Sequence, residues 1–263
     1  MRVPQTIKVR VEGALQPGVS AKDLVLAVVG ELGIAGATYH AIEFEGPGVE
    51  GLSLASRMTL ANMAIEMGAK VGIVHPKGLE WPEADLESLY PDPDAEYIRT
   101  LRIDASALRP QVSRPHMPDH VTPIDNVIGQ EIQMAFIGTC VNGRLEDLQA
   151  AASILNGQQI PPSVRLMIAP ASRDVFLQAM NDGTAQTLTA AGATFLPAGC
   201  GPCVGTHNGV PGPGETVIST ANRNFRGRMG NAKSSVYLAS PATVAASALA
   251  GQIVAPTNTT GAC

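Results

Sequence analysis

The most constraining feature of this chain is a repeated alternation of short apolar strands with segments of helical periodicity. In the first half, TIKVRVE (6–12) alternates apolar and polar residues and predicts a strand. AKDLVLAVVGELG (21–33) predicts a helix, and Ser20 is placed to cap it. The strand-like YHAIEFEG, the helical LASRMTLANMAIEMGAK and the apolar VGIVHP follow in that order. A β-α-β-α-β order predicts an α/β fold with mostly parallel sheets.

The second half resumes the same alternation. IQMAFIG, VRLMIAP and ETVIST predict strands, and LEDLQAAASIL (145–155), RDVFLQAMND and SPATVAASALAG predict helices. Between the halves, prolines interrupt residues 82–123, where we expect a surface connection with one short helix around 94–101. The prediction is therefore two α/β domains, 1–122 and 123–263.

Composition excludes some classes of function. The net charge of −5 and a pI near 5.5 argue against a face that binds nucleic acid. No apolar run approaches the roughly 20 residues that a membrane-spanning helix needs. The first residues, MRVPQTIKVRVEG, lack the apolar segment of a signal peptide, so we expect a cytoplasmic protein.

The cysteines carry the clearest chemical signal. Cys140 follows one predicted strand, and Cys200 and Cys203 lie in AGCGPCVGTHNGV (198–210), on a loop after another strand. Ligands of open α/β sheets bind beyond the carboxyl ends of strands, so these two loops could converge. Gly199, Gly201 and Gly205 would let the backbone wrap closely around a bulky ligand. Cys263 is the last residue, and no role is predicted for it.

Three chemistries fit this cysteine pattern. A CxxC pair could be a redox site, although that leaves Cys140 unexplained. A zinc ion could take three thiolates and His207 as its fourth ligand. An iron–sulfur cluster held by three cysteines would keep one iron open, as a catalytic metal site does. The spacing alone leaves all three open.

A basic loop follows the next predicted strand. STANRNFRGRMG (219–230) contains Arg223, Arg226 and Arg228 together with Asn222 and Asn224. Arginine side chains bind carboxylates with two parallel hydrogen bonds, so this loop could recognise an acidic substrate. The alternative is an ordinary solvated basic loop.

Several segments together resemble the aconitase superfamily. They are IEFEGPGVEGLSLASRMTLANMAIEMGAKVGIV, FIGTCVNGRLEDLQAAASIL, AGCGPCVGTHNGV, STANRNFRGRMG and YLASPATVAASALAG, in this order. More specifically, they resemble the branch of 3-isopropylmalate dehydratase and homoaconitase large subunits. The resemblance covers nearly the whole chain and implies two three-layer α/β/α domains of the aconitase iron–sulfur type.

The resemblance also implies a set of site residues. The family holds a [4Fe-4S] cluster by three cysteines, which match Cys140, Cys200 and Cys203. The open iron acts as a Lewis acid for loss and re-addition of water. The residues that match the family's substrate-binding positions are Asn222, Arg223 and Arg228. Those that match catalytic positions near the cluster are Asn62, Glu66, Asn142 and Arg144, and we expect Asn62 and Glu66 on one helix face.

The implied function is that of a hydro-lyase subunit that isomerises 2- and 3-isopropylmalate in leucine biosynthesis. The alternatives are homoaconitase, in lysine biosynthesis, and a non-catalytic metal-binding module. The family's small subunit would be the partner, and a hydroxy di- or tricarboxylate the substrate. The family's N-terminal domain, with its DSHT-type motif, has no match here, so we expect a chain that is inactive alone.

Overall fold

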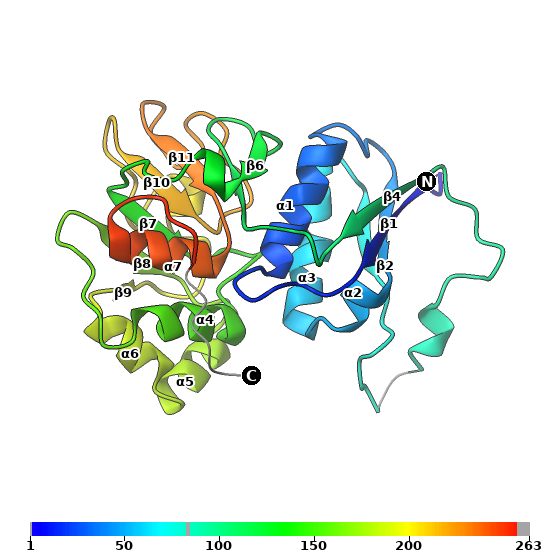
Figure 1. Ribbon diagram of the computed structural model, residues 1–263, viewed down its shortest axis with the longest axis horizontal. Coiled ribbons are helices and arrows are strands. Elements are labelled where there is room, and N and C mark those ends of the chain that lie inside the picture. The colour runs from blue at the N-terminus through cyan, green and yellow to red at the C-terminus, as the bar shows by residue number, and fades with distance from the viewer. Residues whose placement is uncertain (1, 83–84, 257–263) are drawn as a thin grey trace. The chain divides into compact units, whose positions relative to one another are not determined.

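The computed structural model describes residues 2–82 and 85–256 and divides into two compact units, Met1–Arg109 and Pro110–Cys263. Each unit has its own sheet with its own helices (Figure 1). The boundary falls earlier than the position 122/123 expected from the sequence. The reason is that two short strands, β5 (Gln111–Ser113) and β6 (Val121–Pro123), pair with each other and extend the second sheet.

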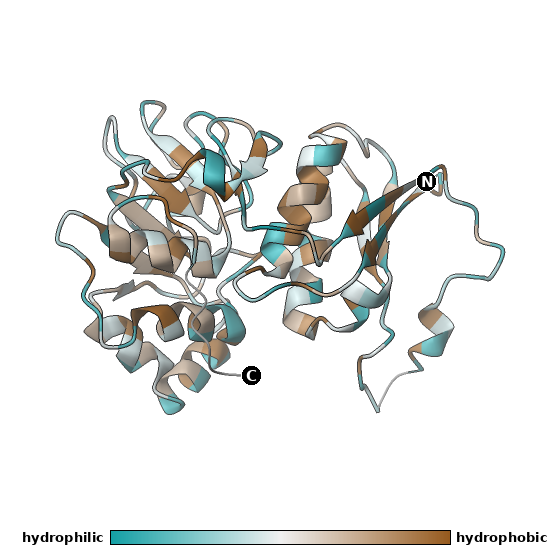
Figure 2. Cartoon of the chain, in the orientation of Figure 1, coloured by the Kyte–Doolittle hydropathy of each residue, from teal (hydrophilic) through white to brown (hydrophobic). Residues whose placement is uncertain are grey.

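The first unit has a parallel four-stranded sheet in the order β3-β2-β1-β4. Its strands are β1 (Thr6–Glu12), β2 (Ala41–Glu45), β3 (Val71–Val74) and β4 (Arg99–Asp104). Its helices are α1 (Ala21–Leu32), α2 (Pro47–Glu50) and α3 (Leu54–Met63), with 3-10 helices at Ala64–Met67 and Glu87–Leu89. In β1 the alternation predicted from the sequence is real, since Ile7, Val9 and Val11 are buried. Figure 2 shows hydrophobic residues along these strands and along α1.

Strand β4 replaces the short helix expected around residues 94–101. It lies parallel to β1, with Leu101 opposite Val9. Leu101 is buried and Ile103 half-buried, while Thr100, Arg102 and Asp104 are exposed, so residues 100–104 follow a strand's two-residue period. The helix prediction was wrong because the surrounding prolines concealed that period.

The second unit has a seven-stranded sheet in the order β6-β5-β11-β10-β7-β8-β9. The strands besides β5 and β6 are β7 (Met134–Ile137), β8 (Arg165–Ile168), β9 (Thr194–Phe195), β10 (Thr216–Ser219) and β11 (Ser235–Leu238). These five are parallel, and β5 joins β11 in the antiparallel sense. The helices are α4 (Leu145–Leu155), α5 (Arg173–Asn181), α6 (Thr184–Ala190) and α7 (Pro241–Ala250), with 3-10 helices at Ile124–Asn126 and Gly201–Val204.

The two faces of the second sheet are covered differently. Helices α5, α6, α4 and α7 contact one another in that order, and their core includes Ala135, Ile137 and Ile218 of the strands. In β7, Phe136 lies between Ala135 and Ile137 and therefore points to the opposite face of the sheet. There it contacts Gly201, which belongs to the segment that carries two cysteines. The α/β class is confirmed, and on this second face the loop with the short 3-10 helix Gly201–Val204 packs against β7.

Candidate functional site

The candidate site lies at the carboxyl edge of the second sheet. Strand β7 has β8 on one side and β10 on the other, and the chain leaves β7 toward β8 through α4. The gap between β7 and β10 is therefore a topological switch point, where ligands of open α/β sheets bind. Cys140 follows β7 and Asn222 follows β10, so both lie at this point.

The turn after β7 has an uncommon backbone. Gly138 has φ 155°, and Thr139 has φ 78°, which few residues other than glycine adopt. The buried Thr220 hydroxyl accepts a hydrogen bond from Gly138 N (2.9 Å) and donates one to Gly138 O (3.0 Å). A residue after β10 thus holds the turn that presents Cys140.

Asn222 connects the same two loops. Its Oδ1 lies 3.4 Å from the Thr139 hydroxyl and 3.6 Å from the Cys140 thiol, and both donate to it. Asn222 is buried, whereas Cys140 is exposed. The structure thus brings Cys140 and Asn222 together, and their role in one site stays a prediction.

Of the other two cysteines, Cys200 immediately precedes a short 3-10 helix, Gly201–Val204, and Cys203 lies within it. Cys200 is exposed and Cys203 is buried. Burial raises the pKa of the Cys203 thiol, an effect that the hydrogen-bonded Arg228 opposes and that charge on Cys140 and Cys200 reinforces. The segment that carries these two cysteines packs against β7, because a Cβ on Gly201 would lie 3.0 Å from the Phe136 ring.

Close backbone contact joins the cysteine segment to the arginine loop. A Cβ on Gly205 would lie 2.6 Å from Gly230 N and 2.7 Å from Arg228 O, and one on Gly230 would collide with Gly205 O. Gly205 also has φ 78°. Both residues must therefore be glycine for the two loops to touch. The sequence suggested that Gly205 makes room for a ligand, but its neighbour is the protein's own backbone.

We expect Gly205→Ala to destabilise this unit by about 2–4 kcal/mol, as the sum of a left-handed φ and the close contact. Gly183→Ala is the matched control, because Gly183 has φ 83° and no described atom lies within 4 Å of its Cβ position. That control should cost only about 1–2 kcal/mol. Urea unfolding measures both values, and equal losses would contradict the proposed contact.

Sequence reasoning missed Asp147, which orients two of the predicted residues. Asp147 Oδ1 accepts a hydrogen bond from Asn142 Nδ2 (3.1 Å), and Oδ2 accepts one from Arg144 N (3.0 Å). The Arg144 guanidinium donates to Val141 O (2.6 Å). Asn142 is buried, and its Oδ1 has no partner within residues 2–82 and 85–256. The signal was an acidic residue at the third position of a helix, as in a capping box.

Burial raises the pKa of Asp147 from 3.8 to about 6, although the hydrogen bond from the Arg144 N–H lowers it. The folded chain therefore holds this proton more tightly than the unfolded chain does. The protonated Asp147 carboxyl stabilises the folded chain fully below about pH 4, and this stabilisation is lost as the pH rises through about 6. The loss amounts to about 3 kcal/mol of unfolding free energy.

Asp147→Asn should abolish this pH dependence, because the amide does not titrate. The Asn142 amide can turn so that its Oδ1 accepts a hydrogen bond from the N–H of the substituted side chain. Unfolding free energies at pH 4 and pH 7 test the expectation. Parallel pH curves for the wild type and the variant would contradict it.

The arginine loop is anchored from inside the unit. Asn224 is fully buried, and its Nδ2 lies within hydrogen-bond distance of Ser113 Oγ (3.2 Å), Arg114 O (2.8 Å) and Val236 O (3.1 Å). Arg223 is half-buried and Arg226 is exposed. This loop is thus a fixed element that carries arginine side chains beside the switch point.

Asn62 and Glu66 belong to the first unit. The sequence predicted one helix over 54–70, and this is wrong; that Asn62 and Glu66 share a face stays a prediction. Helix α3 ends at Met63, so Asn62 lies in its last turn, while Glu66 lies in the 3-10 helix Ala64–Met67. That helix ends at Gly68, whose φ of 83° stops it. Glu66 is buried and Asn62 half-buried.

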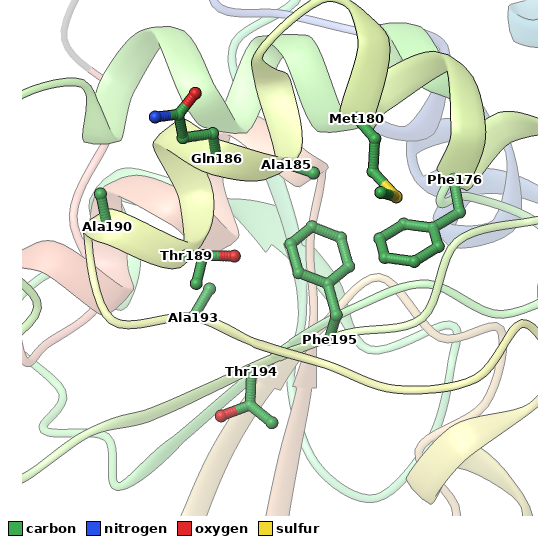
Figure 3. Close-up of a pocket in the computed structure, with 9 residues that line it drawn as sticks. All are labelled: Phe176, Met180, Ala185, Gln186, Thr189, Ala190, Ala193, Thr194 and Phe195. Atoms are coloured by element: carbon green, nitrogen blue, oxygen red, sulfur yellow. The ribbon is translucent and has the colours of Figure 1, made fainter.

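A separate pocket of about 820 Å³ lies between α5, α6 and β9 (Figure 3). Phe176 and Phe195 face each other there, with ring centroids 5.1 Å apart, and Met180 lies beside them. The described residues that line it include no charged residue and no cysteine. The sequence did not predict this pocket, which lacks the chemistry of the cysteine site.

Three remaining expectations concern His207, Cys263 and membrane-spanning helices. His207 is exposed, and in the part of the chain that the structure describes no three His, Cys, Asp or Glu side chains are arranged around a single ion. Cys263 lies outside the described residues. None of the described helices is both long and apolar enough to cross a bilayer.

Comparison with known proteins agrees with the resemblance seen in the sequence. Residues 1–251 match the aconitase family (aconitate hydratase). The chain is 52% identical to the probable methanogen homoaconitase large subunit of Methanosarcina mazei, over 97% of this chain and 66% of that protein. It is 50% identical to 3-isopropylmalate dehydratase large subunit 1 of Methanopyrus kandleri, over 97% of this chain and 62% of that protein.

A third relative has the same coverage. The chain is 50% identical to the homoaconitase large subunit of Thermus thermophilus, over 97% of this chain and 62% of that protein. The chain thus spans less than two thirds of the length of these relatives. Because the family match extends over nearly all of its residues, this chain belongs to the aconitase family.

Proposed function

We propose that Cys140, Cys200 and Cys203 hold a [4Fe-4S] cluster at the carboxyl edge of the second sheet. The observation that carries the proposal is that the Cys200–Cys203 segment packs at Gly201 against β7, the strand that leads into the Cys140 turn, beside a topological switch point. Thiolates are the ligands that iron–sulfur clusters take. The need for reduced thiols also supports a cytoplasmic location.

The residues present fit a cluster better than a single ion. A cluster's thiolates bind different irons, so they need not converge on one point, whereas the four ligands of zinc must. In the part of the chain that the structure describes, the three thiols do not surround one ion position. Three cysteine ligands would leave one iron open, and that iron, when bound, supplies Lewis-acid activation of a hydroxyl group.

The chain's own residues would bind and orient an acidic substrate. Arg223 would pair with a substrate carboxylate through its planar guanidinium. Arg228, which already contacts Cys203, would place positive charge between the thiol and the substrate. Asn222, which holds the Cys140 thiol, would fix the distance between the cysteine turn and the arginine loop.

Two further groups complete the proposed machinery. Asn142 and Arg144 lie on the Cys140 turn, where Asp147 orients them, and the buried Asn142 Oδ1 would accept a hydrogen bond from substrate or water. For Asn62 and Glu66, which lie in the first unit, the family resemblance supports catalytic roles, with the Glu66 carboxylate as a proton acceptor.

The proposed reaction is the isomerisation of 2- and 3-isopropylmalate by dehydration and rehydration, in leucine biosynthesis. The relative from Methanopyrus kandleri carries that name. Homoaconitase, in lysine biosynthesis, is the second candidate, because relatives of that name are equally similar. These relatives are called large subunits, which supports a small-subunit partner.

The test is an assay of the anaerobically reconstituted chain mixed with the N-terminal domain and the small subunit that the resemblance implies, both from the same organism. We expect conversion of 3-isopropylmalate, followed by the ultraviolet absorbance of the unsaturated acid. Conversion of homoaconitate alone would favour the second candidate. A stable metal site without turnover of either substrate would instead indicate a non-catalytic metal-binding module.

A further inference from the structure

The Thr220 hydroxyl takes the place of a backbone group at the end of a strand pair. Strands β7 and β10 pair in register up to Phe136 and Ser219, and Thr220 N then donates to Phe136 O (3.0 Å). At Gly138 the chain turns away from the ladder, with φ 155°. The N–H and C=O of Gly138 both bond to the Thr220 hydroxyl instead, at 2.9 and 3.0 Å.

This pair of hydrogen bonds fixes the path of the backbone into Cys140. Gly138 is packed, since a Cβ there would lie 2.7 Å from Ala169 O. Thr139, the next residue, has φ 78°, and its hydroxyl accepts from Val141 N (3.4 Å). The conformation of the turn therefore depends on contacts at its start, and Thr220 makes two of them within a fully buried site.

We propose that Thr220 is a positioning residue that holds the Cys140 turn in the shape that binds the cluster. The inference rests on the proposed function, because it assigns the turn's purpose to that cluster. Thr220 itself donates no ligand. Without its hydroxyl, two buried polar groups of Gly138 would lose their partners, and the turn would open to water.

The test compares Thr220→Val, which removes the hydroxyl and keeps the shape, with Thr220→Ser, which keeps the hydroxyl. In the metal-free chain we expect amide hydrogen exchange in a peptide covering residues 138–141 to rise by about tenfold in Thr220→Val. Thr220→Ser should exchange at nearly the wild-type rate. A peptide from the distant α5 helix is the internal control and should not change.

The second measurement is cluster loss from the reconstituted chain in the presence of an iron chelator. We expect loss about tenfold faster in Thr220→Val than in the wild type, with rescue by Thr220→Ser. If Thr220→Val does not fold, the pair Thr220→Ala and Thr220→Ser, which differ by one hydroxyl, replaces it.

The outcomes that would contradict the proposal can be told apart by these two measurements. Faster exchange without faster cluster loss would overturn the positioning role and leave the cluster proposal intact. Unchanged amide hydrogen exchange in Thr220→Val would show that the Thr220 hydroxyl does not hold the Cys140 turn, and this would overturn the proposal. A wild-type chain that takes up no cluster would overturn the proposed function and, with it, this assignment.

Discussion

Serine in place of Cys140, Cys200 or Cys203 is expected to lower the iron and sulfide content of the reconstituted chain by at least about tenfold. A serine hydroxyl is a harder donor and is far less acidic than a thiol, so it replaces a thiolate poorly. The three cysteines come from two loops that meet at one switch point, and each is expected to be necessary.

Cys263→Ser is the matched control for these variants. It makes the same chemical change at the end of the chain, where no cluster ligand is predicted. Its iron and sulfide content should equal that of the wild type. A Cys140→Ser chain that retains a full cluster would contradict the assignment of Cys140 as a ligand.

The second large effect is expected at Arg223. Arg223→Lys keeps the positive charge but loses the two parallel hydrogen bonds that a guanidinium gives a carboxylate. Breaking such a pair costs about 2–5 kcal/mol when it is excluded from water, so kcat/KM should fall by about 30-fold or more. The assay uses the same mixture as the test of the proposed function, with either candidate substrate.

Arg226→Lys is the control on the same loop. Arg226 is exposed, whereas Arg223 is half-buried beside Asn222, so Arg226→Lys should leave kcat/KM near the wild-type value. Cluster content should be unchanged in both variants, because neither residue is a predicted ligand. Unchanged kcat/KM in Arg223→Lys would indicate general attraction of acidic substrates by positive charge, which both substitutions preserve, rather than recognition by Arg223.

Local patterns predicted the helices best. The expected helix over 145–155 is observed with those bounds, and its apolar positions Leu148, Ala151, Ala152 and Leu155 are buried. Ser20 caps α1 with a capping box, and Ser172 caps α5. Each of these features depends on side chains within four residues of one another, which a sequence displays directly.

Features that depend on distant partners were harder to predict. Strand β11 is only four residues long, and β5 has three, so each owes its place to pairing with a neighbour. The α3 segment has continuous helical periodicity, yet the helix changes to a 3-10 turn at Ala64. Periodicity does not report the tertiary packing that makes such a change.

The candidate site, too, was only partly predictable from the sequence. Residue types and their order in the chain pointed to the three cysteines and to the arginine loop. The contacts that hold these loops were not visible in the sequence, because Thr220 acts on Gly138 and Gly205 acts on Gly230 across long stretches of chain. Those long-range contacts give the cysteine turn its shape.

The most direct test of the account is the metal and sulfide content of the wild-type chain after anaerobic reconstitution. The account predicts about four irons and about four sulfides per chain. It also predicts that mild oxidation releases one iron and leaves a three-iron electron paramagnetic resonance signal, since only three cysteines serve as ligands. Bound zinc, or iron without sulfide, would contradict the cluster assignment.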